Sequence, residues 1–223
     1  MKTIKHYLTL GMISVVIIFT SCTKESSLGA PVDQEQIIPY DQNLSLEENM
    51  LKGASMDQIL MNHEKRDVEG LEYKGGVVFH IDEQTRMAYI GAKEDLPGTY
   101  VWGEYGKSLG CRSANLSDDK KNCRTIINAN ATETAASACA SAEINGYKDW
   151  YLPGRYALSE MLKEFRKTDW EIDGSRWTCT ENCNLTSISG RIKEMSETSF
   201  SIPWGSSDKN RSYKVRPIRS INY

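Results

Sequence analysis

The feature that most constrains this chain is a short apolar run that ends at Cys22. Two lysines lie in the first five residues, an apolar stretch follows from about Leu8 to Phe19, and the sequence turns abruptly polar after Cys22. A basic start, a short apolar middle and small residues before a cut site are typical of a secretory signal, whereas a membrane-spanning helix needs about 20 apolar residues. We therefore expect residues 1–21 to be a signal peptide and the rest of the chain to fold outside the cytoplasm.

The residues Thr20-Ser21-Cys22 resemble the lipobox of bacterial lipoproteins. In that motif the cysteine receives a diacylglycerol and becomes the new N-terminus, so the resemblance makes Cys22 the lipidation site and the membrane a partner through the attached lipid. The absence of Asp after Cys22 resembles outer-membrane sorting in enteric bacteria, which implies an envelope protein at the outer membrane. The alternative is an ordinary signal peptide with a chance cysteine.

Charge is distributed unevenly along the chain. The whole sequence has a net charge of -3, and residues 23–72 hold eleven acidic and four basic side chains. Residues 191–219 hold seven basic and three acidic side chains. This basic segment forms either a solvated surface or a face for an anionic ligand. An acidic chain of this kind disfavours nucleic acid as a partner.

About 200 residues remain after the signal, enough for one domain on a tether. Residues 22–74 are expected to form an acidic tether with short helices, started by capping boxes at Ser45 and Ser55, which either docks on the domain or extends a stalk. The domain is expected over residues 75–223. Strands are predicted at 77–82 and 86–90, loops over 95–122, and helices over 132–143 and after Pro153.

Several motifs in this order resemble the DUF1566 family, also called the Lcl C-terminal domain family. They are Gly75 to Asp82, the helix residues Ala135, Ala136 and Cys139, Gly146-Tyr147-Lys148-Asp149-Trp150-Tyr151-Leu152-Pro153, Trp177-Thr178-Cys179-Thr180-Glu181 and Lys214 to Arg219. The resemblance implies an α+β, C-type-lectin-like domain with two helices, short antiparallel strands and long loops, in the style of a Bacteroidetes lipoprotein. It also implies that Val215 and Ile218 return the chain to the first strand of the domain. Arg216 or Arg219 is then expected to pair with Asp149.

Five cysteines follow Cys22. In an exported protein the first interpretation of the cysteines is that they form disulfides, and the local pairs Cys111–Cys123 and Cys179–Cys183 are the simplest choice. A zinc site is the alternative, but no C-x-x-C is present. Many family members carry a cysteine where this chain has Pro217, so Cys139 is expected to be a buried free thiol. We predict no metal site and no cofactor.

The chemistry-bearing residues favour binding over catalysis. After the signal only His63 and His80 remain as histidines, and neither lies in a context that indicates a hydrolytic triad. Three aromatic residues in Gly-rich or Ser-rich loops are candidate ligand contacts: Trp102, Tyr105 and Trp204. We therefore expect a lipid-anchored envelope protein that binds a glycan or another surface protein, without catalytic residues. The alternative is an enzyme of the formylglycine-generating-enzyme-like class.

Overall fold

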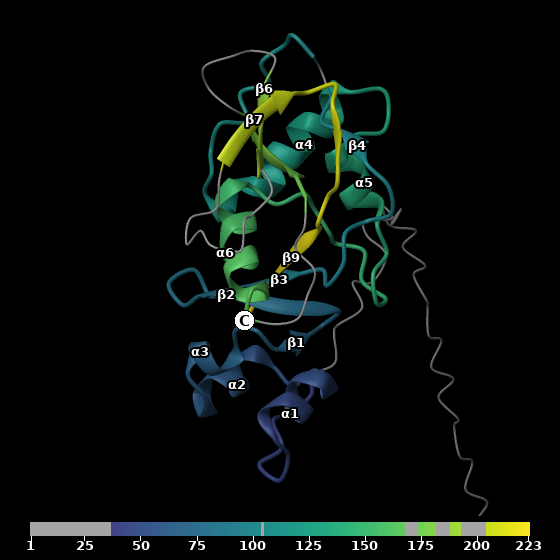
Figure 1. Ribbon diagram of the computed structural model, residues 1–223. Helices are drawn as coiled ribbons and strands as arrows, with labels where there is room; N and C mark the ends of the chain where they lie inside the picture. Colours follow the sequence, from purple (N-terminus) through teal and green to yellow (C-terminus); the bar gives the residue numbers. More distant parts are fainter. Residues whose placement is uncertain (1–36, 104, 168–173, 182–187, 193–203) are drawn as a thin grey trace, which may run out of the picture. The chain divides into compact units, whose positions relative to one another are not determined.

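The computed structural model describes residues 37–103, 105–167, 174–181, 188–192 and 204–223 (Figure 1). These residues belong to one compact unit, Ile37–Tyr223. No helix in these ranges has the length and apolarity needed to cross a bilayer. Cys22, the predicted lipidation site, and Cys183 lie outside the described residues.

Three short helices open the unit: α1 (Leu46–Lys52), α2 (Met56–Asn62) and α3 (Lys65–Val68). Ser45 accepts a hydrogen bond from the N–H of Glu48 while the Glu48 side chain accepts one from the Ser45 N–H, which confirms the predicted capping box. Gly53 ends α1 in the left-handed conformation, with φ of 81°. Ser55 then caps α2 at once, so the chain turns sharply between the two helices.

A four-stranded antiparallel sheet follows, in the order β1 (Glu72–Tyr73), β2 (Gly76–Asp82), β3 (Met87–Gly91) and β9 (Ile218–Asn222). The hairpin β2–β3 confirms the predicted strands, and Asp82 holds its turn by accepting bonds from the N–H groups of Gln84 and Thr85. The prediction that the C-terminal segment pairs with the first long strand is wrong. β1 occupies that edge of β2, so β9 pairs with β3.

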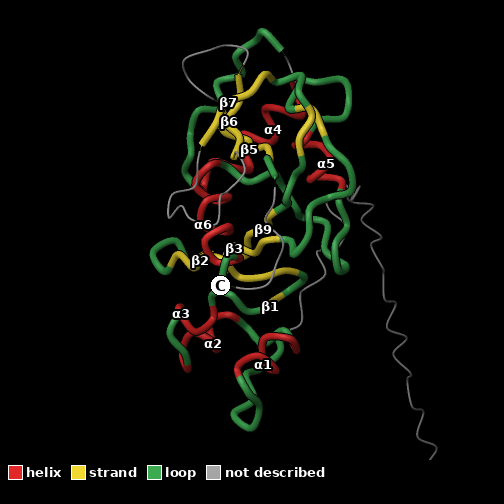
Figure 2. Tube along the Cα trace, viewed as in Figure 1, coloured by secondary structure: helices red, strands yellow, loops and turns green. Residues whose placement is uncertain are grey.

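The two faces of this sheet line two separate cores. Val78 and Ile90 are paired across the strands and belong to the core shared with α1–α3. Val77, Phe79 and Tyr89 belong to the other core, which contains the later helices. Figure 2 shows α1–α3 on one side of the sheet and α4, α5 and α6 on the other.

Helices α1–α3 correct the predicted boundary at residue 75. Met50, Met56, Ile59 and Val68 are fully or almost fully buried in the same core as the sheet residues. The Tyr73 hydroxyl also donates to the Ala54 carbonyl oxygen at 2.7 Å. Residues 37–74 therefore dock on the sheet as part of the domain, because their apolar side chains cover a face that would otherwise meet water.

The second core is built on helices α4 (Asp119–Ala129), α5 (Ala135–Ser141) and α6 (Arg155–Phe165), with a 3-10 turn η1 (Leu116–Asp118) before α4. The helix predicted after Pro153 is confirmed as α6, and the apolar residues along one of its faces are buried: Leu158, Met161, Leu162 and Phe165. The helix predicted over 132–143 is shorter, and it is capped by Thr134 with Ser137. The predicted loop over 95–122 contains η1 and the start of α4.

The remaining strands complete an α+β fold. β4 (Tyr100–Val101) pairs with β8 (Ser212–Tyr213), and β5 (Arg176–Glu181), β6 (Ile188–Ile192) and β7 (Trp204–Asp208) form a three-stranded antiparallel sheet. The described residues contain six α-helices. The mixed α+β class is therefore confirmed. The expectation of two helices over residues 75–223 is wrong, because the described part of that range contains three, α4, α5 and α6, and the polar buried positions of α4 hide its periodicity.

The arginines near the C-terminus are structural. The Arg219 guanidinium binds Asp149 with Nε–Oδ1 at 2.7 Å and lies over the Tyr147 ring at 3.9 Å, which confirms the predicted pairing. Arg216 instead binds Asp95, with Nε–Oδ1 at 2.9 Å, and shares that carboxylate with Arg176. Burial alone would raise the pKa of Asp95, but hydrogen bonds from the two arginines hold it below its usual range.

Candidate functional site

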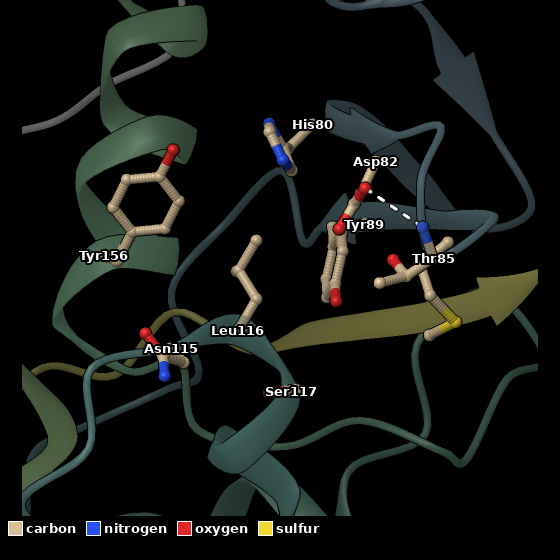
Figure 3. Close-up of a pocket in the computed structure, with 9 residues that line it drawn as sticks. His80, Asp82, Thr85, Tyr89, Asn115, Leu116, Ser117 and Tyr156 are labelled. Carbon is tan, nitrogen blue, oxygen red and sulfur yellow. Dashed lines mark hydrogen bonds between the residues drawn. The ribbon is translucent and has the colours of Figure 1, made fainter.

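A pocket of about 670 Å³ opens between the β2–β3 hairpin, η1 and α6 (Figure 3). Its volume lies within the roughly 300–1,000 Å³ that small-molecule sites occupy. The described lining residues are His80, Asp82, Thr85, Met87, Tyr89, Asn115, Leu116, Ser117 and Tyr156.

A β-bulge brings the strand residues of the pocket together. The pairing of β2 with β3 shifts between Val78 and His80, so Phe79 is the extra residue. Beyond the bulge His80 lies opposite Tyr89, and Asp82 lies opposite Met87. Directly opposed residues share a face, so all four lie on the face that carries Tyr89 toward the second core.

Three rings lie close together in the pocket lining, those of His80, Tyr89 and Tyr156. The His80 ring lies 5.9 Å from the Tyr89 ring and 6.2 Å from the Tyr156 ring, centre to centre, the latter edge-on at 86°. Tyr89 is buried, whereas Tyr156 is 45% exposed at the start of α6. Figure 3 shows Tyr156 on one side of Leu116, and Asp82, Tyr89 and Thr85 on the other. The pocket lining therefore combines a buried ring, Tyr89, with an accessible ring, Tyr156.

Polar groups complete the lining. Hydrogen bonds from Thr85, together with the N–H of Gln84, lower the pKa of Asp82, so its carboxylate is negative at neutral pH. Burial, followed by the charges of Asp82 and Asp119, raises the pKa of Tyr89, so its hydroxyl stays protonated and able to donate. Among the described lining residues His80 is the only basic one. A negative carboxylate and a single basic residue among the described lining residues disfavour an anionic ligand.

The pocket does not form a catalytic triad. His80, Asp82 and Ser117 all line it, but in the described part of the chain no hydrogen bond joins His80 to either of the others. A serine nucleophile needs a hydrogen-bonded base that is itself held by a carboxylate. Within the same residues, no group of three or more histidine, cysteine or acidic side chains is placed to hold a metal ion.

Trp102, a predicted ligand contact, is fully buried. Its indole Nε1 donates to the Thr178 carbonyl oxygen at 2.8 Å, and the Lys209 ammonium lies 4.2 Å from its ring centre. The Lys209 side chain is itself fully buried, bonded to the Glu181 carboxylate and at 2.6 Å to the Lys107 carbonyl oxygen. The expected exposed platform is therefore wrong, because this indole covers a buried ion pair.

Of the other two predicted aromatic contacts, Tyr105 is not among the described lining residues of the pocket. Tyr105 lies in a loop with 56% of its surface exposed, so it remains accessible to a ligand. Trp204 begins β7, and its side chain lies outside the described residues. Sequence reasoning missed His80, Asp82, Tyr89 and Tyr156. The sequence did contain one signal for this site: the predicted strand carries His80 and Asp82 two residues apart, so that both side chains lie on the same face.

The predicted disulfides are absent. Cys111, Cys123, Cys139 and Cys179 are buried free thiols, so neither Cys111–Cys123 nor Cys179–Cys183 forms in the structure. The sulfur of Cys111 lies 3.7 Å from the Asn122 carbonyl oxygen, and that of Cys123 lies 3.1 Å from the Leu152 carbonyl oxygen. Each thiol thus faces a backbone carbonyl. The expectation of a buried free thiol at Cys139 is confirmed.

Asp119 is the most perturbed carboxyl group of the second core. Its side chain is fully buried and accepts a hydrogen bond from the Gly154 N–H at 2.8 Å. Burial raises its pKa to about 7, against the effect of that hydrogen bond. Asp119 is not among the lining residues of the pocket, so we assign it to the core.

No protein-family model matches the chain, and a search of curated proteins finds no similar sequence.

Proposed function

We propose that this chain is a lipid-anchored envelope protein whose domain binds a neutral, hydroxyl-rich ligand, such as a sugar, in the pocket beside His80. The observation that carries the proposal is the pairing of an exposed aromatic ring, Tyr156, with a charged carboxylate, Asp82, across one cavity. A flat ring packs against the C–H face of a sugar, and carboxylate, amide and hydroxyl groups exchange hydrogen bonds with its hydroxyls.

A C-type-lectin-like fold is part of this proposal. The family motifs in the sequence support it, and so does the mixed arrangement of helices and antiparallel strands. The Trp177 and Trp150 motifs are also buried, as expected for motifs that build a fold. Function then depends on the pocket rather than on the fold.

The test is ligand binding by saturation-transfer NMR, with the mature chain and a panel of neutral and acidic sugars. We expect neutral sugars to bind. Tyr156→Ala should weaken binding about 2- to 10-fold, because aromatic packing contributes about 0.5–1.5 kcal/mol. Asp82→Asn should weaken it about 10- to 150-fold, because a hydrogen bond to a charged group contributes about 1.5–3 kcal/mol.

Tyr105→Ala is the matched control, because it removes another exposed tyrosine, one that is not among the described lining residues of the pocket. Binding should be unchanged in this variant. Loss of binding in Tyr105→Ala with retention in Tyr156→Ala would move the site to the 105 loop. Preference for acidic sugars would contradict the role of Asp82.

A further inference from the structure

A buried carboxyl group, that of Asp119, joins two of the elements that line the pocket. Asp119 is the first residue of α4, and its N–H donates to the Leu116 carbonyl oxygen and closes η1. Its Oδ2 accepts a hydrogen bond from the Gly154 N–H at 2.8 Å, directly before α6. Leu116 lines the pocket from η1, and Tyr156 lines it from the first turn of α6 (Figure 3). Asp119 therefore connects the two walls, although it is not among the described lining residues.

Gly154 leaves room for this carboxyl group. Its φ of -73° and ψ of 174° are angles that any residue adopts, so its backbone conformation does not require glycine. A Cβ atom at this position would lie 2.0 Å from Oδ1 of Asp119, which is much closer than two atoms can approach. The missing side chain therefore lets the carboxyl group lie directly on the Gly154 backbone.

The first turn of α6 depends on other elements for its position. Its N-cap is Gly154, which has no side chain to accept a hydrogen bond from the N–H groups of that turn. β5 holds the two flanking residues by hydrogen bonds, from the Cys179 N–H to the Pro153 carbonyl oxygen and from the Arg155 N–H to Thr180 Oγ1. The bond from Gly154 to Asp119 is the one that ties the turn to the segment after η1.

We propose that Asp119 is a positioning residue of the pocket, which holds the first turn of α6 against η1 and so keeps the Tyr156 ring in the pocket wall. Removal of the carboxyl group would take the acceptor from the Gly154 N–H and leave empty space beside it. The turn would then shift and carry Tyr156 with it. The effect on a ligand rests on the function proposed above, whereas the effect on the pocket walls does not.

The test reads the pocket walls directly, by NMR of the imidazole protons in the mature chain. The His80 ring lies 6.2 Å from the Tyr156 ring, so its chemical shifts respond to a movement of that ring. His63, beside Tyr40, is the internal reference. Spectra are recorded at pH 5. Burial raises the pKa of Asp119 to about 7, so its carboxyl group is neutral at that pH and its replacement leaves the charge of the protein unchanged.

Asp119→Ala should shift the His80 signals and leave those of His63 in place. Asp119→Asn should restore the wild-type signals, because the amide oxygen accepts from the Gly154 N–H. Gly154→Ala should shift the His80 signals too, since its Cβ collides with the carboxyl group, and it decides the outcome if Asp119→Ala does not fold. Ile126→Ala is the control for lost stability, because it opens the same core about two turns further along α4, and should leave the His80 signals unchanged.

Ligand binding separates positioning from simple destabilisation. With a neutral sugar that binds the wild type, Asp119→Ala should weaken binding about 2- to 10-fold, as Tyr156→Ala does, because it acts through that ring. The two losses should therefore not add in the double variant. Additive losses, or His80 signals that stay in place in both Asp119→Ala and Gly154→Ala, would overturn the proposal. If no sugar binds the wild type, the proposed function fails, and the His80 signals still decide whether Asp119 positions the pocket.

Discussion

At the residue scale, several charged side chains that the sequence pattern would place on the surface are buried in the fold. Lys209 belongs to a basic segment that reads as a solvated surface, yet its ammonium lies between Glu181 and the Trp102 ring. Glu181 in turn accepts hydrogen bonds from the N–H groups of Leu109 and Gly110, so it holds the loop before Cys111. Composition cannot predict such a pair, because its partners are far apart in the chain.

Lys209→Met should destabilise the protein by about 3–5 kcal/mol, because it leaves the Glu181 carboxylate buried without its cation. Chemical denaturation measures this loss. Lys148→Met is the control: Lys148 pairs with Glu143 on the surface, with 72% of its side chain exposed, and should change stability by less than about 1 kcal/mol. Equal effects in the two variants would show that the Lys209 pair is not buried in solution.

Asp119 makes stability depend on pH. Its folded-state pKa of about 7 lies above the ordinary value near 3.9, so the folded protein keeps a proton that the unfolded chain has lost. Stability should therefore fall as pH rises from about 4 to 7, by up to about 1.4 kcal/mol per pH unit, and level off above.

The Asp119→Asn variant should lose most of this slope and exceed the wild type in stability at pH 8, since the amide oxygen can still accept from Gly154. Denaturation curves at intervals from pH 4 to 8 measure both effects. A wild-type stability that rises over this range would contradict the assignment.

At the element scale, segments with clear periodicity were predictable and the others were not. The β2–β3 hairpin and α6 show apolar residues at the spacing of a strand and of a helix. Helix α4 was not predicted, because its buried positions include Asp119 and Asn122 and its sequence therefore shows no apolar stripe. The bulge at Phe79 has no sequence signature, yet it sets the face of His80 and hence the pocket.

The docking of α2 can be tested on the helix itself. Ile59→Ala should destabilise the protein by about 2–4 kcal/mol, because Ile59 is fully buried against the sheet. Met61→Ala is the control on the same helix, since Met61 is 81% exposed, and should stay within about 0.5 kcal/mol of wild type. Thermal or chemical unfolding measures both. Two neutral substitutions would mean that residues 46–62 act as a free tether.

At the scale of the whole molecule, one sheet serves two cores, so the helices before residue 75 and those after it stabilise the same strands. Composition could not decide this organisation, because the acidic segment over residues 23–72 is compatible both with docking on the domain and with a solvated stalk. A fragment that begins at residue 75 would expose the apolar face that α1–α3 cover. Binding experiments therefore require a chain that includes residues 37–74.

The proposed anchor is testable at this scale too. Cys22→Ser should move the protein from the membrane fraction to the soluble envelope fraction, or leave an uncleaved precursor, because two or more acyl chains are needed for stable anchoring. Cell fractionation and the mass of the N-terminal peptide measure this. Normal cleavage with full membrane retention of the variant would rule out anchoring through Cys22.

The position of β9 also controls the timing of folding. β9 is the last strand along the chain, yet Ile218 enters one core while Arg219 and Ile221 lie against the other. Neither core can close around a nascent polypeptide until residue 222 has left the ribosome, and pairings between distant segments form slowly. Both cores are therefore complete only when residues 37–222 are all available, so a shorter, still growing polypeptide lacks the strand that both cores share.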